Sequence, residues 1–259
     1  MRSLDVACIC QNEEEVLPWM LRACEALLPA LRTVVLVDGG STDSTLDVIQ
    51  SWRHRVPIAL FHHPFDNFMA QKNRALEKCT ADWIVLADSD MTWTSNLRDE
   101  IVNGSFDSAP FWDVPLYYTV VDAYHYETSS ARVGISTRFC KNVGARYVRP
   151  IHEYLCWPGE ESPADRMAMD RKDWESIRKD GRLGATTRVA FFERTLNKSD
   201  AGLQAKCARY EPFAELSTKA GIYMVKDRDR LMNERNRLVA AGQYAPLPDQ
   251  YKALVIEGA

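Results

Sequence analysis

Short apolar runs alternate with amphipathic helical patterns through about the first 90 residues of the chain. The runs are rich in Val, Ile and Leu, as the strands of a buried parallel sheet are, and polar residues separate them from the helical segments. The predicted strands are Leu4–Cys10, Thr33–Asp38, Ile58–His62 and Trp83–Ala87, and the predicted helices between them are Glu14–Leu28, Ser44–Arg53 and Phe68–Lys78. Since helical crossovers join parallel strands, this order predicts an α/β fold in which helices flank both faces of a mostly parallel central sheet.

The pattern changes from about residue 95 onward. Longer strand-like segments indicate a mixed or antiparallel continuation of the sheet, and the chain becomes polar and helical after Pro158. The predicted elements are a helix at Ser95–Asn103, strands at Trp112–Thr119, Arg132–Cys140 and Arg146–Leu155, and helices at Arg171–Lys179, Thr186–Thr195, Asp200–Ala220 and Lys226–Ala240. We predict one domain over residues 1–160, with halves at 1–92 and 93–160, and a small helical C-terminal extension over residues 161–259 packed on it.

Composition places the chain among ordinary globular proteins. Its 259 residues are 46% apolar and 26% charged, so a fibrous or disordered chain is excluded. No apolar run reaches the roughly 18 residues of a spanning helix, and Asp5 interrupts the apolar start that a signal peptide needs. The seven cysteines are odd in number and lie mostly in apolar segments, which favours reduced core thiols. We expect a cytoplasmic protein without a transmembrane segment.

The formal net charge of −4 conceals an asymmetry along the chain. Acidic residues outnumber basic residues before residue 128, and basic residues outnumber acidic residues after it. Two interpretations remain open: the second part meets an anionic partner, or solvated helical faces carry these charges.

Polar clusters follow several predicted strands, at the edge where α/β sheets bind ligands. The cluster Asp38-Gly39-Gly40-Ser41-Thr42-Asp43 follows the second strand and opens a helix, whose free N–H groups favour an anion. This arrangement is typical of nucleotide binding. The alternative is a plain helix cap, in which Ser41 or Asp43 accepts backbone N–H bonds.

Asp88-Ser89-Asp90 comes directly after the apolar strand Trp83–Ala87. Residues i and i+2 of an extended segment project to the same side, so the two carboxylates converge and repel each other unless a hard cation lies between them. A divalent metal that holds a diphosphate meets that need. The alternative is a surface turn, because Asp-x-Asp is common by chance.

Between these clusters, the helix predicted at Phe68–Lys78 presents Gln71, Lys72 and Arg74 in its early turns. Near a diphosphate, Lys72 or Arg74 would supply positive charge or orient the sugar. The alternative is that these side chains form the polar face of an amphipathic helix.

Four ordered motifs resemble those of the family 2 glycosyltransferases of the GT-A fold: Asn12-Glu13-Glu14, VDGGSTD (Val37–Asp43), AQKNRAL (Ala70–Leu76) and ADWIVLADSD (Ala81–Asp90). The resemblance implies a GT-A type nucleotide-diphospho-sugar transferase fold, with residues 1–92 as its donor-binding half and 93–160 as its acceptor-side half. It also implies that Asp38 recognises the base of a nucleoside diphosphate sugar, usually uridine. Asp88 and Asp90 then lie at the ribose, the diphosphate and a Mn²⁺ or Mg²⁺ ion. The donor-binding residues expected from the motifs and their surroundings are Gln11, Asn12, Glu13, Asp38, Gly39, Gln71, Arg74, Asp88 and Ser89.

A second resemblance covers Ser136–Phe139 and RYVRPIHEYL (Arg146–Leu155). It is similar to the R-x-F…HE segment of a subgroup that includes lipopolysaccharide-core-like and TPR-bearing transferases. A histidine after the sheet often completes the metal site in GT-A enzymes, so we expect His152 to join Asp90 and Asp88 as a ligand; the alternative is a structural histidine. An inverting transfer needs a carboxylate to take the acceptor proton, and the candidates are Glu153 and Asp122.

These features predict a metal-dependent glycosyltransferase that moves a sugar from a nucleoside diphosphate sugar, expected to be a UDP-sugar, to an acceptor hydroxyl. The acceptor is a saccharide, a lipid-linked glycan or a hydroxylated base in phage-type DNA, whose phosphates would meet Arg132, Arg138, Lys141, Arg146 and Arg149. One alternative is an inert nucleotide-sugar-binding or scaffold protein. Another is a sugar-1-phosphate nucleotidyltransferase, which is disfavoured because Gln11–Glu15 stands where that class carries a Gly-rich basic loop.

Overall fold

The computed structural model describes residues 2–119, 126–127, 134–148, 153–156, 182–194, 198–210 and 249–256. The described helices are α1 (Leu17–Glu25), α2 (Thr45–Trp52), α3 (Phe68–Lys78), α4 (Leu97–Val102), α6 (Asp200–Ala208) and α9 (Asp249–Lys252). The first strands are β1 (Leu4–Cys10), β2 (Leu31–Asp38), β3 (Ile58–His62), β4 (Trp83–Asp88), β5 (Met91–Trp93) and β6 (Phe111–Thr119). The later strands are β7 (Tyr126–Glu127), β8 (Gly134–Lys141), β9 (Arg146–Val148), β10 (Tyr154–Cys156), β11 (Leu183–Ala185) and β12 (Phe191–Glu193).

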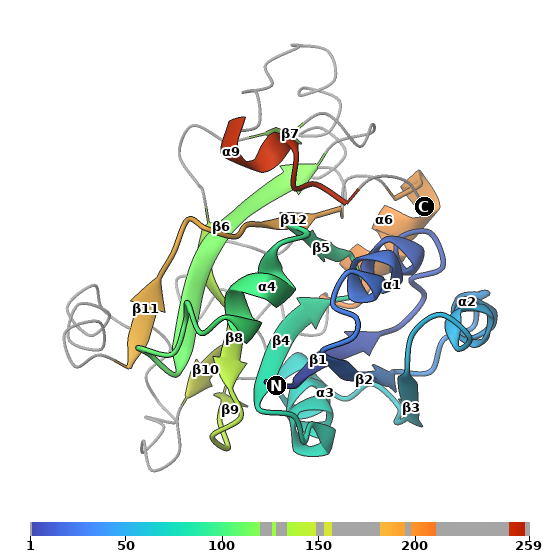
Figure 1. The fold of residues 1–259 in the computed structure, drawn as a ribbon. Helices are drawn as coiled ribbons and strands as arrows, with labels where there is room; N and C mark the ends of the chain where they lie inside the picture. The colour runs from blue at the N-terminus through green and yellow to red at the C-terminus, as the bar shows by residue number, and fades with distance from the viewer. Residues whose placement is uncertain are drawn as a thin grey trace, which may run out of the picture.

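A ten-stranded sheet forms the centre of the fold, in the order β3-β2-β1-β4-β8-β6-β12-β5 with β7 and β11 paired to β6 (Figure 1). Strands β3, β2, β1 and β4 are parallel, whereas β8 runs antiparallel to both β4 and β6. The predicted α/β fold with a parallel N-terminal half and a mixed continuation is confirmed. Strands β9 and β10 form a second, two-stranded antiparallel sheet.

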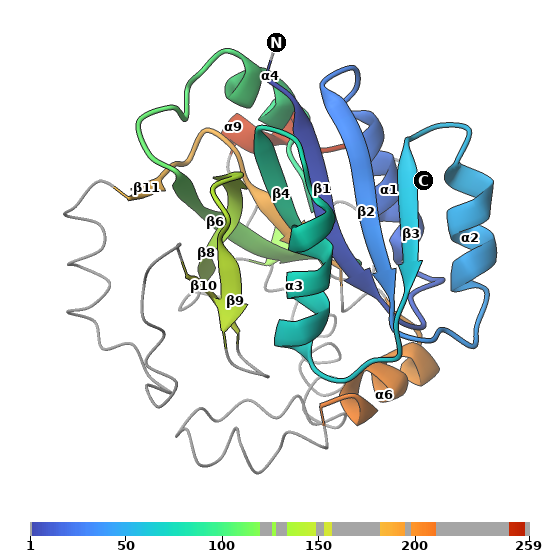
Figure 2. The ribbon, with the colours of Figure 1, turned by 90° about the horizontal axis from the view of Figure 1, so that it is seen from below.

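Two hydrophobic cores cover the two faces of the sheet, as the alternation of strands and helices predicts. Alternate residues of β1 divide between them: Val6 packs with α1, α2 and α4, whereas Ala7 packs with α3. Figure 2 shows α3 on one face and α1 and α2 on the other. The strand ends that carry the polar clusters are thereby fixed on a packed scaffold.

The prediction of a helix over Thr186–Thr195 is wrong. Residues Phe191–Glu193 form β12, which lies parallel to β6 and antiparallel to β5. Short apolar runs cannot be assigned to helix or strand from periodicity alone, and here the side chains of Val189 to Phe192 are buried on both sides of an extended segment. Strands β11 and β12 belong to the range 161–259, so this range is not purely helical and it completes the sheet. The division at residue 160 stays a prediction.

The cysteines are confirmed as reduced core residues, because all seven are free and buried. Burial raises the pKa of the Cys8, Cys10 and Cys24 thiols, which disfavours their reactive thiolate form. In the part of the chain that the structure describes, no helix combines the length and the apolar character needed to cross a bilayer.

Candidate active site

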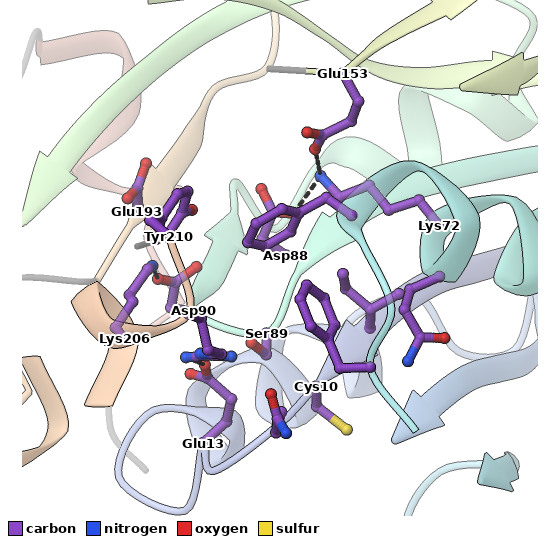
Figure 3. A pocket seen from close by; sticks show the side chains of 16 residues that line it. Cys10, Glu13, Lys72, Asp88, Ser89, Asp90, Glu153, Glu193, Lys206 and Tyr210 are labelled. Carbon is purple, nitrogen blue, oxygen red and sulfur yellow. Dashed lines mark hydrogen bonds and ion pairs between the residues drawn. The ribbon is translucent and has the colours of Figure 1, made fainter. Parts of the chain in front are cut away.

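A pocket of about 690 Å³, including space open to solvent, lies at the carboxyl ends of β1 and β4 (Figure 3). The described lining residues are Ile9, Cys10, Gln11, Glu13, Phe65, Phe68, Gln71, Lys72, Asp88, Ser89, Asp90, Glu153, Glu193, Lys206, Arg209 and Tyr210. Among the expected site residues, Gln11, Glu13, Gln71, Asp88, Ser89, Asp90 and Glu153 are therefore brought together.

Asn12 links the loop after β1 to the loop after β2. Its φ of 54° is in the left-handed region, which Asn tolerates better than most residues. Its backbone N–H donates to Ser41 Oγ at 3.0 Å, and its side-chain oxygen accepts from the Thr42 N–H at 2.8 Å. Asn12 is not among the described lining residues, so its observed contacts fix the two loops that frame the pocket.

Asp38 is buried at the end of β2 and caps the turn that follows it. Its carboxylate accepts hydrogen bonds from the backbone N–H groups of Gly40 and Ser41 and from Ser41 Oγ, at 2.5 to 3.2 Å. Asp43, one of the two residues of the helix-cap alternative, accepts from the Thr45 N–H at the start of α2, and Asp38 is not among the described lining residues. Gly39 lies beside it, and a Cβ there would come within 3.1 Å of Phe65 Cβ and 3.3 Å of Gln11 Cβ. Both of those neighbours do line the pocket.

Asp88 ends β4 between two basic side chains. Its carboxylate lies 2.8 Å from Lys72 Nζ and 3.2 Å from an Arg138 guanidinium nitrogen. Burial alone would raise the pKa of Asp88, but the charges of Lys72 and Arg138 outweigh this effect and lower the pKa to about 2. Asp88 is therefore ionised at neutral pH.

Asp90 follows Ser89, which separates it from Asp88, and forms an ion pair with Lys206 of α6. Burial alone would lower the pKa of Lys206, but Asp90 and Glu193 raise it, so the lysine stays charged. The backbone carbonyl of Asp90 accepts from the Arg194 N–H at 2.7 Å, at the end of β12. The missed strand β12 thus helps to fix Asp90.

Lys72 and Arg74 of α3 have different surroundings. Lys72 lines the pocket and contacts Asp88, whereas Arg74 forms two hydrogen bonds with the Asp66 carboxylate at 2.7 and 2.9 Å. The structure therefore places Lys72 where the donor-binding prediction named Arg74. Residues i and i+2 of a helix do not share a face, so Lys72 and Arg74 point in different directions, and Arg74 pairs with Asp66. Gln71 is buried beside them and donates to the His63 carbonyl at 2.8 Å.

Glu153 faces the pocket from the β9–β10 side, with one carboxylate oxygen 2.5 Å from Lys72 Nζ. His152 and Asp122, the expected third metal ligand and the second candidate base, lie outside the described residues. Arg138 is directed at Asp88 rather than at solvent, so it is not part of an open phosphate-binding surface.

The segment 198–210 contributes Lys206, Arg209 and Tyr210 to the lining, and the site prediction contained none of them. Glu13 anchors this segment, because its carboxylate lies 2.7 Å from Lys198 Nζ and 2.6 Å from a nitrogen of Arg209. The sequence feature that pointed to these contacts was the charge asymmetry of the chain, since basic residues after residue 128 here pair with acidic residues before it.

Three aromatic side chains gather at one side of the pocket. The Phe68 and Tyr210 rings stack with centroids 4.9 Å apart, and the Phe65 ring meets Phe68 edge-on at 5.0 Å. Stacked and edge-on pairs of this kind are favourable, and they give the pocket an aromatic wall.

The pocket offers carboxylate oxygens, the ligand type that a hard divalent cation prefers. Among the described residues, the lining contains five carboxylates and three basic side chains: Glu13, Asp88, Asp90, Glu153 and Glu193, with Lys72, Lys206 and Arg209. Arg138 and Lys198 pair with two of these carboxylates from outside the lining, so the described charges balance. A diphosphate would need additional positive charge, which a cation on carboxylate oxygens supplies. No three acidic, His or Cys side chains of the described segments are clustered as a complete metal site.

Comparison with known proteins identifies the family. The model of glycosyl transferase family 2 matches residues 5–126. The lipopolysaccharide core biosynthesis glycosyltransferase LpsC of Rhizobium meliloti (strain 1021) is 30% identical over 204 residues, which cover 71% of this chain and 73% of LpsC. The chain belongs to glycosyltransferase family 2. An uncharacterized glycosyltransferase of Rickettsia typhi, RT0209, is 28% identical over 101 residues, covering 39% of this chain and 32% of that protein.

The GT-A fold of this family 2 glycosyltransferase is also found in a solved protein structure. The structure of residues 1–349 of S. aureus TarS matches 93% of this chain and 73% of that one, with a TM-score of 0.51 and 13% sequence identity. At this identity the similarity establishes the fold alone. Five lining residues of the glycosyltransferase pocket lie beyond the matched range 5–126: Glu153, Glu193, Lys206, Arg209 and Tyr210.

Proposed function

We propose that this glycosyltransferase transfers a sugar from a UDP-sugar to an acceptor hydroxyl with the help of a divalent metal ion. The observation that carries the proposal is the pocket at the ends of β1 and β4, where Asp88, Ser89 and Asp90 meet Gln11 and an aromatic wall. Nucleotides bind at this edge of α/β sheets. The TarS fragment, which has the same fold, has been solved with UDP and with UDP-GlcNAc.

Asp90 and Asp88 are the residues that would hold the metal, Mn²⁺ or Mg²⁺, with His152 as the third ligand. When bound, the metal offsets the negative charge of the departing diphosphate. Gln11, Gln71 and Ser89 line the pocket and offer hydrogen-bonding groups to the nucleotide. Asp38 and Gly39 lie behind the lining residues of the pocket. We still propose that Asp38 contacts the base of the nucleotide.

Glu153 is the proposed general base. In a single displacement, the acceptor hydroxyl gives its proton to the Glu153 carboxylate while its oxygen forms a bond to the anomeric carbon of the sugar. The bond from that carbon to the diphosphate oxygen breaks, and its electron pair stays on UDP. This arrangement would invert the configuration of the anomeric carbon. Glu153 suits the task because its carboxylate faces the pocket and is only 13% exposed.

A saccharide is the proposed acceptor class. LpsC, which covers most of this chain, is named as an enzyme of lipopolysaccharide core biosynthesis. The DNA hypothesis depends on a row of basic residues, and Arg138 of that row is paired with Asp88 inside the site. A glycan hydroxyl requires no such row.

Differential scanning fluorimetry with Mn²⁺ and a panel of UDP, other nucleoside diphosphates and UDP-sugars tests the donor site. We expect stabilisation by UDP that depends on the metal and is lost in Asp90→Asn, because a ligand that binds only the folded state raises its stability. Asp47→Asn, an exposed position on α2, is the matched control and should respond as the wild type does. An inert scaffold would bind UDP but would not cleave any UDP-sugar to UDP. The absence of stabilisation by every nucleotide would contradict the proposal.

A further inference from the structure

The element that carries Glu153 to the pocket is separate from the main sheet. Strands β9 and β10 pair only with each other among the described strands, and Glu153 directly precedes β10. The backbone of the central sheet therefore does not fix the height or angle of this hairpin over the pocket. Its described contacts include those of β9 with α3.

Asn73 of α3 holds β9 through hydrogen bonds to both the N–H and the carbonyl of one β9 residue, Tyr147. The Tyr147 N–H donates to Asn73 Oδ1 at 2.6 Å, and Asn73 Nδ2 donates to the Tyr147 carbonyl at 2.9 Å. These two bonds fix the position of β9 along the helix as well as its distance from it. Asn73 is not among the described residues that line the donor pocket, so its contact acts on the hairpin alone.

Lys72, the residue before Asn73, contacts Glu153 directly before β10 and so holds the other strand of the hairpin. Its ammonium group lies 2.8 Å from Asp88 Oδ1 and 2.5 Å from Glu153 Oε1, and 5.3 Å from the centre of the Tyr147 ring. Figure 3 shows this nitrogen between the two carboxylates. The Lys72 and Glu153 side chains are only 14% and 13% exposed, so water screens this ion pair much less than a surface pair.

We propose that Lys72 and Asn73 are positioning residues that hold Glu153 at the donor pocket, so that one turn of α3 sets the distance between the donor site and the acceptor base. The inference rests on the proposed function of Glu153. Asn73 fixes the strand before Glu153, and Lys72 fixes its carboxylate and joins it to Asp88 of the donor site. The acceptor oxygen then meets a base whose place is fixed before any substrate binds.

Asn73→Ala is the informative variant, because it releases the hairpin without altering a charge or a lining residue. A displacement of about 1 Å at the reacting centre costs about 100-fold in rate, and we expect a loss of 10- to 100-fold. Lys72→Met should lose at least as much, and Lys72→Arg should recover part of the rate because it restores the charge. Lys78→Met is the matched control on the same helix, where the side chain is exposed.

The assay follows UDP release from whichever of UDP-glucose, UDP-galactose and UDP-GlcNAc the wild type hydrolyses fastest, with water as the acceptor. UDP affinity in the presence of Mn²⁺ is measured by calorimetry in parallel, and melting temperatures identify any variant that fails to fold. We expect Asn73→Ala to bind UDP within twofold of the wild type while its turnover falls. A merely structural role would lower both together. In a Glu153→Gln background, Asn73→Ala should cost nothing further, because both changes remove the same function.

A turnover of Asn73→Ala within twofold of the wild type, or a full additional loss in the Glu153→Gln background, would overturn the inference and leave the proposed function standing. A parallel loss of UDP affinity in Asn73→Ala would also overturn it. A wild type that neither binds UDP nor hydrolyses any of the three donors would overturn the proposed function itself, and the inference with it.

Discussion

Replacing Glu13 with glutamine tests how the segment 198–210 is held over the pocket. The Glu13 side chain is 3% exposed and its carboxylate contacts Lys198, which is 1% exposed, and Arg209, which is 18% exposed. Removing one partner of a buried ion pair costs about 3–5 kcal/mol, because the remaining charge stays buried without its counter-ion. We expect about 3 kcal/mol, the lower end, since glutamine keeps one acceptor oxygen and Arg209 retains some contact with water.

The melting temperature gives the measurement. For a chain of this size, a loss of 1 kcal/mol lowers it by about 2–4 °C, so Glu13→Gln should melt about 6–12 °C below the wild type. Glu77→Gln, an exposed change on α3, is the control and should stay within about 0.5 kcal/mol. Combining Glu13→Gln with Lys198→Met should restore part of the loss, because the buried charge is then removed as well.

A fall of less than about 2 °C in Glu13→Gln, or a double variant less stable than the single one, would refute this reasoning. Either result would mean that the Glu13 ion pairs stabilise the fold no more than a surface ion pair does, by at most about 1 kcal/mol. The basic residues of the segment would then have no anchoring function at the loop after β1.

Two further predictions follow from the site. Because the pKa of Asp88 is lowered to about 2 in the folded state, its ionised form stabilises the fold above the ordinary carboxyl pKa of about 4, by about 2 kcal/mol. This contribution is lost as the pH falls from about 4 to 2. The free energy of unfolding of metal-free Asp88→Asn should therefore depend less on pH in that window than that of the wild type. An equal pH dependence in the two proteins would contradict this. Gly39→Ala would place a Cβ 3.1 Å from Phe65 Cβ and 3.3 Å from Gln11 Cβ, so we expect UDP affinity, measured by calorimetry, to fall about 3- to 10-fold with a small change in melting temperature. Unchanged affinity would show that the two lining residues can shift without loss.

The sequence predicted the N-terminal half of the fold closely because its strands and helices have distinct periods. The predicted bounds of β1, β3 and α3 agree with the structure, since polar residues mark both ends of each apolar run. Strand β12 was missed because its three residues depend on pairing with β6 and β5, which no local pattern encodes. Similarly, Arg146–Leu155 was predicted as one strand, whereas the structure has β9 and β10 as a hairpin.

The sequence does not tell which face of α3 turns toward the pocket, because that choice depends on tertiary packing. Lys72 and Arg74 are two residues apart on one helix and so point in different directions, and Lys72 meets Asp88 while Arg74 meets Asp66. The loop motifs were found because glycines and carboxylates cluster there in sequence. Lys206, Arg209 and Tyr210 lie far along the chain from those motifs, and only folding brings them to the pocket.

The charge asymmetry of the chain has an explanation within the molecule itself. At the pocket, basic residues of the later part meet acidic residues of the first part at three places: Lys198 and Arg209 at Glu13, Lys206 at Asp90, and Arg138 at Asp88. In these contacts, the acidic groups that the later part meets belong to the first part of the same chain. Each of these pairs also touches the pocket, so the ion pairs that assemble the two parts place balanced charge around the donor site. A donor that arrives together with a divalent cation adds little net charge to such a site, whereas a bare diphosphate adds an excess that the buried groups cannot offset.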